Sequence, residues 1–285
     1  MRISVSSYSF HQYLSSGRMT QLDCIAKAKE MGFEGIEFTD LSGETLEEQK
    51  EYAAQIRKKA DEVGIDICAY TVGASLFRET EEEMQEEVER LKGQLEVAKI
   101  LGAPIMRHDT CWQLTKTGKG RSFDLMLPDL ANSCRQITEY GQSLGIVTCS
   151  ENHGQIGQDS DRMERLFNAV NHDNYGLLID TGNFACVDED PALAVSRLAP
   201  YAVHVHAKEL YIRDEEEEHC DYPTRGGKYL GGAVIGEGDI PVKQCMRILR
   251  RAGYDGFVSI EYEAAEDCMT GIARALVNLK KMISE

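Results

Sequence analysis

The chain has 285 residues and 42% hydrophobic content, enough to bury the core of one large α/β domain or of two small ones. Its formal net charge of −17, from 48 acidic and 31 basic residues, repels phosphodiester backbones and anionic membranes, so we expect neither nucleic acid nor a membrane as a partner. The nine cysteines, an odd number without a CxxC pair, indicate reduced thiols and a cytoplasmic location, and the sequence shows neither a signal-peptide pattern nor an apolar run of about 18 residues.

Short apolar or β-branched segments alternate with segments of helical periodicity along the whole chain. We expect strands at 2–6, 35–38, 65–70, 103–108, 146–151, 175–180, 202–207 and 256–263. We expect helices near 19–31, 44–63, 81–101, 123–144, 160–170, 190–199, 240–252 and 265–284. Eight strand–helix units in about 250 residues predict a parallel (β/α)8 TIM barrel formed by one domain over 1–285. An open doubly wound sheet is the alternative, but no GxGxxG motif follows the first strand.

The connections between these elements follow two patterns. Five expected helices end in a glycine that should adopt the left-handed conformation of a short helix-to-strand loop. These are Gly32, Gly64, Gly102, Gly145 and Gly253. The one long connection, 208–239, follows the seventh strand, so we expect a lid or substrate loop over the barrel mouth.

Polar residues collect where the expected strands end, which is the end of a TIM barrel that carries the chemistry. They are Glu37, His108, Asp109, Glu151, Asn152, His153, Asp180, Asn183, His206, Lys208, Glu209, Glu261 and Glu263. Charged groups that converge on one axis at low dielectric need compensation, and a divalent cation is the simplest one.

Several of these residues also have a purely structural explanation. Glu151 could be an ordinary acid near a helix, and Asp180 could form an Asx turn. His204 and His206 should point to the same side of their strand. We expect the deeper His204 to pack in the core and His206, nearer the rim, to be the ligand. By the same alternation of side chains, Glu261 and Glu263 share one face of the eighth strand. We expect Glu261 to be the ligand and Glu263 to lie beyond the strand.

Taken together and in order, the motifs resemble the xylose isomerase-like TIM-barrel superfamily, of the sugar phosphate isomerase/epimerase and AP endonuclease family 2 type. The resemblance is to the branch with ketohexose 3-epimerases and inositol-catabolism enzymes. The matching segments are "SENHG", "IDTGN", "HVHAKE", "GEGDIP" and "GFVSIEYE", which span nearly the whole chain. The resemblance implies a single divalent metal site with four ligands: Glu151, Asp180, His206 and Glu261.

The donor atoms of these ligands indicate which metal and which type of reaction to expect. Three carboxylates and one imidazole form an oxygen-rich site, for which we expect Mn²⁺, with Mg²⁺, Co²⁺ or Zn²⁺ as alternatives. Two open octahedral positions would accept adjacent oxygens of a hydroxy-ketone, and the metal would stabilise the enediolate formed on proton loss. In related epimerases the two metal-bound glutamates act on opposite faces of the sugar. The resemblance therefore implies Glu151 and Glu261 as the acid/base pair.

Six further residues are expected to contact the substrate or to support the ligands. Asn183 replaces a histidine found in some family members, which disfavours a site with several metal ions. The others are His108, Trp112, His153, Lys208 and Glu209; Trp112 would stack on a sugar face, whereas His153 could also brace its loop.

The first function hypothesis is a metal-dependent isomerase or epimerase of a free sugar or sugar-like polyol. The second is a lyase on the same scaffold, either an inosose-type dehydratase or an enzyme that β-eliminates oxidised glycosides. A DNA-repair endonuclease is disfavoured by the acidic charge and by Asn183. A non-catalytic subunit or binding module would leave the four ligands unexplained. The sequence leaves open a homo-oligomer or a second subunit.

Overall fold

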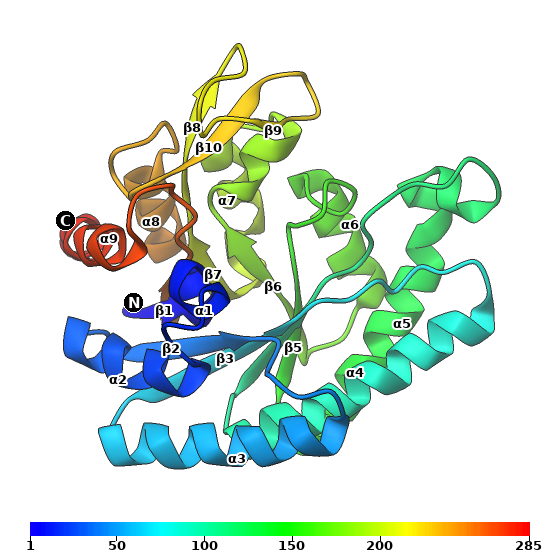
Figure 1. The fold of residues 1–285 in the computed structure, drawn as a ribbon. Coiled ribbons are helices and arrows are strands. Elements are labelled where there is room, and N and C mark those ends of the chain that lie inside the picture. Colours follow the sequence, from blue (N-terminus) through cyan, green and yellow to red (C-terminus); the bar gives the residue numbers. More distant parts are fainter.

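The computed structural model describes all residues 1–285, and its centre is a closed barrel of eight parallel strands (Figure 1). The strands follow each other around the barrel in the order β1-β11-β7-β6-β5-β4-β3-β2. Their bounds are β1 Arg2–Ser6, β2 Gly35–Thr39, β3 Asp66–Val72, β4 Ile105–His108, β5 Val147–Glu151, β6 Tyr175–Asp180, β7 Ala202–Ala207 and β11 Phe257–Ile260. The predicted (β/α)8 TIM barrel is confirmed.

Helices cover the outside of the barrel. They are α2 Gln21–Met31, α3 Leu46–Val63, α4 Glu81–Leu101, α5 Phe123–Leu144, α6 Ser160–Val170, α7 Pro191–Leu198, α8 Val242–Arg251 and α9 Cys268–Ser284. No helix has both the length and the apolar composition that crossing a membrane would require.

Local sequence signals define the helix ends. Thr20, Thr45 and Thr80 begin α2, α3 and α4 with capping boxes, in which the threonine and an acid three residues later satisfy backbone N–H groups that the helix leaves free. The five glycines expected after helices all have positive φ, between 72° at Gly64 and 90° at Gly253. The prediction of left-handed loop glycines is therefore confirmed.

The structure departs from the expected elements at several points. The eighth barrel strand ends at Ile260, so Glu261 follows the strand instead of lying within it. A 3₁₀ turn, η1 Ser7–Phe10, and a short helix, α1 His11–Ser15, follow β1 where no element was expected. The last helix begins at Cys268 instead of 265.

The long connection after β7 is more ordered than a lid loop. It forms a three-stranded antiparallel sheet of β8 Glu209–Arg213, β10 Tyr229–Ala233 and β9 Tyr222–Pro223, in that order. Figure 1 shows this sheet extending beyond the barrel next to β7 and α7. Because β8 begins two residues after β7 ends, the sheet is attached directly to the mouth of the barrel.

Candidate metal centre and active site

Four side chains converge at the C-terminal mouth of the barrel. They are Glu151 at the end of β5, Asp180 at the end of β6, His206 on β7 and Glu261 directly after β11, and one ligand atom of each lies within 4.8 Å of the others. His206 Nδ1 lies 3.4 Å from Glu151 Oε1, 3.8 Å from Asp180 Oδ2 and 3.7 Å from Glu261 Oε1. Three carboxylates therefore surround one imidazole nitrogen.

Strand register explains why residues so distant in sequence meet. Asp180 lies opposite His206 in the β6–β7 pair, and Ser259 lies opposite His206 in the β11–β7 pair, which places Glu261 just beyond. The β2–β3 pair shifts its register immediately before Glu37, and such irregularities redirect side chains beside functional sites. Parallel strands in this register bring their C-terminal residues to one layer of the barrel.

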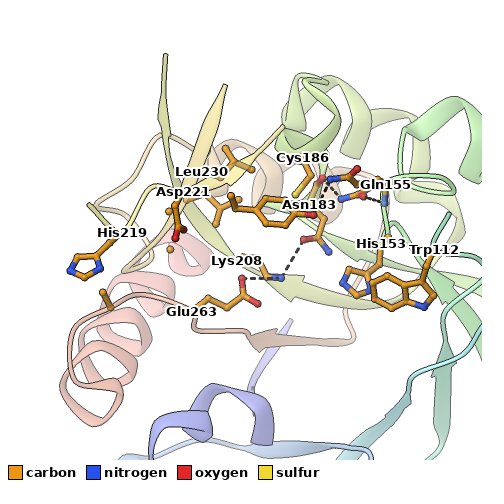
Figure 2. A pocket seen from close by; sticks show the side chains of 17 residues that line it. Trp112, His153, Gln155, Asn183, Cys186, Lys208, His219, Asp221, Leu230 and Glu263 are labelled. Atoms are coloured by element: carbon orange, nitrogen blue, oxygen red, sulfur yellow. Dashed lines mark hydrogen bonds and ion pairs between the residues drawn. The ribbon is translucent and has the colours of Figure 1, made fainter. Parts of the chain in front are cut away.

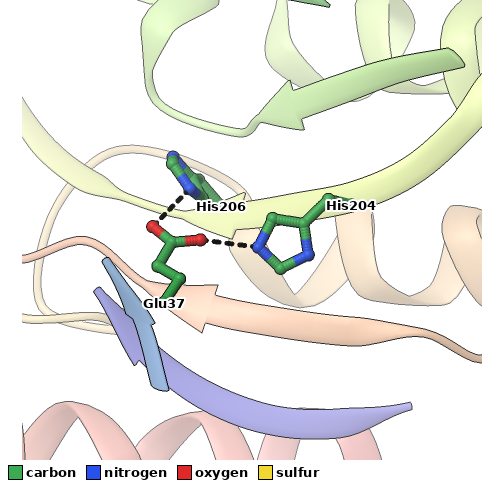
Figure 3. A group of neighbouring side chains, drawn as sticks. All are labelled: Glu37, His204 and His206. Atoms are coloured by element: carbon green, nitrogen blue, oxygen red, sulfur yellow. Dashed lines mark hydrogen bonds and ion pairs between the residues drawn. The ribbon is translucent and has the colours of Figure 1, made fainter. Parts of the chain in front are cut away.

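Glu37 on β2 orients the imidazole of His206 (Figure 3). One carboxylate oxygen lies 2.8 Å from His206 Nε2 and the other lies 2.6 Å from His204 Nε2. Burial alone would raise the pKa of Glu37, but the facing imidazoles of His206 and His204 hold it well below its usual range. With its Nε2 at Glu37, His206 directs Nδ1 at the three carboxylates, as metal-binding histidines do. His204 is buried as expected, and it also holds Glu37 in place.

Two of the buried polar atoms without a hydrogen-bond partner, Asp180 Oδ2 and His206 Nδ1, face each other in this cluster. Each such atom costs about 1–3 kcal/mol if nothing binds it. Asp180 Oδ1, by contrast, accepts hydrogen bonds from the backbone N–H of Gly182 (2.7 Å) and Asn183 (2.9 Å). Asp180 thus forms a turn with one oxygen and directs the other at the cluster. These atoms fit a divalent cation that prefers oxygen and imidazole ligands.

Charge balance in the cluster also fits a cation. Burial raises the pKa of Asp180 to about 7; Lys208 opposes this rise, whereas Glu261 and Glu151 add to it. For His206, burial would lower the pKa, but Glu37, Glu261 and Glu151 raise it well above its usual value. At neutral pH His206 therefore holds a proton and Asp180 is partly protonated, and a metal ion that binds here must displace these protons.

Arg107 on β4 binds the second carboxylate oxygen of Glu151. Its Nη2 forms an ion pair with Glu151 Oε2 and another, at 2.7 Å, with Asp109 Oδ1. The Oε1 atom of Glu151 faces His206 and accepts a hydrogen bond from Asn183 Nδ2 at 3.1 Å. Burial alone would raise the pKa of Glu151, but Arg107 and His206 hold it well below its usual range. Glu151 is therefore ionised.

Lys208 holds Glu261 in the corresponding way. Its Nζ lies 2.5 Å from Glu261 Oε2 and 3.5 Å from both Asp180 Oδ2 and Glu263 Oε2. Burial would lower the pKa of Lys208, but Asp180, Glu261 and Glu263 raise it well above its usual value, so the ammonium group stays charged. Burial also acts to raise the pKa of Glu261, yet Lys208 and His206 lower it. Both glutamates of the cluster are thus carboxylates able to accept a proton.

Two adjoining cavities open at this cluster. The first, of about 300 Å³, is lined by Glu151, His206, Glu261 and Arg107 among others, and we call it the catalytic cavity. The second, of about 570 Å³, lies between the β8-β10-β9 sheet and the chain after β5, and we call it the sheet cavity (Figure 2). Four residues line both: Trp112, His153, Lys208 and Glu263.

Of the six residues expected around the substrate, four line these cavities. Trp112, His153 and Lys208 line both, and Asn183 lines the sheet cavity, where its Oδ1 accepts a hydrogen bond from Lys208 Nζ at 3.2 Å. His153 Nδ1 lies 2.9 Å from Asp109 Oδ1, and its ring packs edge-on against Trp112. In addition to lining the cavities, His153 therefore braces its loop.

The other two residues line neither cavity. His108 is fully buried, with Nδ1 at the backbone carbonyl of Asp109, and Arg107 lines the cavity instead. Glu209 accepts hydrogen bonds from the backbone N–H of Gly236 (3.0 Å) and Ile240 (2.7 Å), so it fixes the chain between β10 and α8. Successive residues of an extended chain point to opposite sides, so Arg107 and Lys208 line the cavities whereas the neighbouring His108 and Glu209 do not.

Sequence reasoning missed Arg107 altogether and gave Glu37 and Asp109 no role. A signal existed for Arg107, which stands two residues before Asp109 and must share its face of the extended chain. Nothing in the sequence pairs Glu37 with His204 and His206, because that contact joins β2 to β7 across the barrel.

Comparison with known proteins agrees with the fold. The family described as xylose isomerase-like TIM barrel matches residues 25–282. An inosose dehydratase of Lacticaseibacillus casei is 28% identical over 137 residues, 47% of this chain and 46% of that protein, so the chain spans about half the length of the curated relatives it matches.

Two solved structures illustrate the likeness. The structure of an L-ribulose 3-epimerase has a TM-score of 0.75 at 16% identity, with 99% of this chain and 94% of that chain covered. The IOLI protein with a bound zinc atom has a TM-score of 0.75 at 16% identity, covering 100% and 98%. The family match extends over most of the residues, and the chain therefore belongs to the xylose isomerase-like TIM-barrel family.

Proposed function

We propose that the protein is a metal-dependent isomerase or epimerase that moves a proton at the carbon beside the carbonyl of a sugar or sugar-like polyol. The observation that carries the proposal is the pair Glu151 and Glu261. Both are ionised, and each directs one oxygen at His206 Nδ1 while a cation holds the other. One carboxylate would remove the proton and the other would return it, which inverts the carbon when the two act on opposite faces.

The metal-binding residues of this proposal are Glu151, Asp180, His206 and Glu261. When bound, one divalent ion would supply Lewis-acid polarisation of the substrate carbonyl. We propose Mn²⁺ first because three of the four donors are carboxylates; the zinc atom bound to the IOLI protein supports Zn²⁺ as an alternative, beside Mg²⁺ and Co²⁺.

The remaining residues of the site hold the two glutamates and favour an uncharged substrate. Arg107 and Lys208 neutralise Glu151 and Glu261, which would otherwise repel each other. They are also the only permanent cations that line the catalytic cavity, and both are already paired with carboxylates. A phosphate group would find no free cation there, so we propose an unphosphorylated substrate.

Dehydration is the second candidate, favoured by the similarity to an inosose dehydratase. A lyase begins with the same proton removal and then expels a leaving group, and that group needs a proton donor. The charged Lys208 ammonium, which lies beside Glu261, is placed to donate it.

A solvent-exchange screen tests both candidates. Protein loaded with Mn²⁺ is incubated in deuterated water with ketoses, inososes and oxidised glycosides, and the products are identified. A deuterated stereoisomer supports the isomerase or epimerase. A dehydrated or cleaved product without a stereoisomer contradicts it in favour of the lyase, and the absence of any exchange contradicts both.

A further inference from the structure

We propose that the sheet cavity is a subsite for a neutral, partly apolar substituent of the sugar, with the aromatic aglycone of a glycoside as its ligand class. This inference rests on the proposed function, because it places the carbonyl-bearing sugar ring in the catalytic cavity. The two cavities adjoin through the residues that line both, so a substrate in one reaches directly into the other.

The sizes of the cavities support a substrate of two parts. Small-molecule sites span about 300–1,000 Å³, and the catalytic cavity of about 300 Å³ stands at the lower end of this range. A bare sugar ring in that cavity would make no contact with most of the sheet cavity of about 570 Å³. A sugar with a second ring system would fill both.

The lining of the sheet cavity indicates the chemistry of the second part. Six of its seventeen lining residues are hydrophobic, against two of fourteen in the catalytic cavity. Leu210 and Leu230 come from the added sheet and Cys186 from the turn after β6. Lys208 is the only permanent cation that lines the cavity, and Glu261 and Glu263 already pair with it. A phosphate therefore has no free partner, whereas a planar apolar group has a matching surface.

Two aromatic side chains line this cavity, and polar contacts fix each of them. Trp112 is 47% exposed, yet its indole Nε1 donates to the Ala74 carbonyl at 2.8 Å and its ring packs against His153. Tyr222 on β9 is 48% exposed, and its hydroxyl accepts a hydrogen bond from Gln155 Nε2 at 3.0 Å. Large aromatic faces left open to solvent but held in one orientation are suited to stacking on a flat ligand.

The wall of the sheet cavity is fixed to the catalytic residues. Gly232 on β10 packs so closely on the backbone of Glu263 that an added Cβ would lie 2.4 Å from its carbonyl carbon. Gly232 also bridges to Ala264, three residues after Glu261. On the other side, Gln158 Nε2 donates to the Asn183 carbonyl at 2.6 Å. The sheet thus stands in a set position relative to the catalytic cavity, as a specificity-determining wall requires.

Binding of two glucosides tests the subsite without relying on turnover. Trp112 is the only tryptophan of the chain, so its fluorescence reports ligand binding at the junction of the two cavities. Phenyl β-glucoside should bind at least about 10-fold more tightly than methyl β-glucoside. Tyr222→Ala, at an exposed position that should leave folding intact, should remove most of this difference. Tyr229→Ala, a tyrosine of the same sheet that lines neither cavity, should leave it unchanged.

The outcomes separate this inference from the proposed function. Equal affinity of the wild type for the two glucosides, or equal effects of the two tyrosine variants, would overturn the subsite. The 3-keto derivatives of both glucosides are then incubated with the Mn²⁺ protein in deuterated water. Absence of deuterium at the carbon beside the carbonyl in both, together with no exchange on ketoses and inososes, would contradict the proposed function, while the binding comparison would still decide the subsite.

Discussion

Replacing Glu37 by Gln tests whether this residue prepares His206 for a metal ion. The substitution keeps the size of the side chain but removes the charge that lies 2.8 Å from His206 Nε2 and 2.6 Å from His204 Nε2. Loss of a carboxylate that orients a metal-binding histidine typically weakens metal binding by about 10- to 100-fold, or about 1.4–2.7 kcal/mol. Because Glu37 also raises the pKa of His206, the variant should bind metal with less competition from protons.

Two changes should therefore appear when Mn²⁺ binding is measured by calorimetry across a series of pH values. The limiting affinity at alkaline pH should fall about 10- to 100-fold, and the pH of half-maximal binding should move downward. Glu30→Gln, which removes an exposed glutamate paired only with Lys27, should change neither quantity. If Glu37→Gln keeps the wild-type affinity at alkaline pH with a native circular-dichroism spectrum, the orienting role is refuted.

Three further predictions concern other residues of the mouth. Asp180→Asn keeps the oxygen that accepts hydrogen bonds from the Gly182 and Asn183 N–H groups, so the protein should fold normally. Elemental analysis of the purified variant should find no stoichiometric metal, and full metal content would refute the ligand assignment. Arg107→Met leaves Glu151 and Asp109 buried without their cation. The free energy of unfolding, measured by urea titration in the presence of a chelator, should fall by about 3–5 kcal/mol. A loss below ~1 kcal/mol, as expected for an exposed pair such as Lys119 and Asp129, would contradict this. Burial raises the pKa of Glu209 from 4.5 to about 7. The stability that protonation of this residue contributes is therefore fully present below pH 4.5 and is lost as the pH rises through 7. Relative to Glu209→Gln, the wild type should therefore lose up to ~3 kcal/mol between pH 4.5 and 8, and parallel stability curves would refute the shift.

The sequence predicted the barrel because the information for it is local. The periodicity of strands and helices, and loop glycines such as Gly64 and Gly145, can be recognised within short segments without knowledge of distant contacts. The meeting of Glu151, Asp180, His206 and Glu261 follows from the fold, because parallel strands deliver their last residues to one end of the barrel.

What the sequence could not supply depends on contacts across the barrel or on side-chain direction. The link from Glu37 to His204 and His206 joins strands more than 160 residues apart, as the separation of 167 between His204 and Glu37 shows. The sequence predicted His108 at the substrate site, whereas Arg107 lines the cavity. A shift of one residue in a strand moves a side chain to the opposite face, and the sequence does not fix the strand to within one residue. The β8-β10-β9 sheet was hidden because its strands are short and separated by glycines and charged residues that also suit loops.

In the proposed reaction, Glu261 moves a proton at the carbon beside a metal-polarised carbonyl. The most direct measurement is the rate at which the Mn²⁺ protein incorporates solvent deuterium into the reactive substrate, compared between the wild type, Glu261→Gln and Glu266→Gln, an exposed glutamate near the same strand. We predict that Glu261→Gln slows incorporation by about 10²- to 10⁴-fold and that Glu266→Gln does not. Incorporation at the wild-type rate by metal-loaded Glu261→Gln would contradict this role of Glu261.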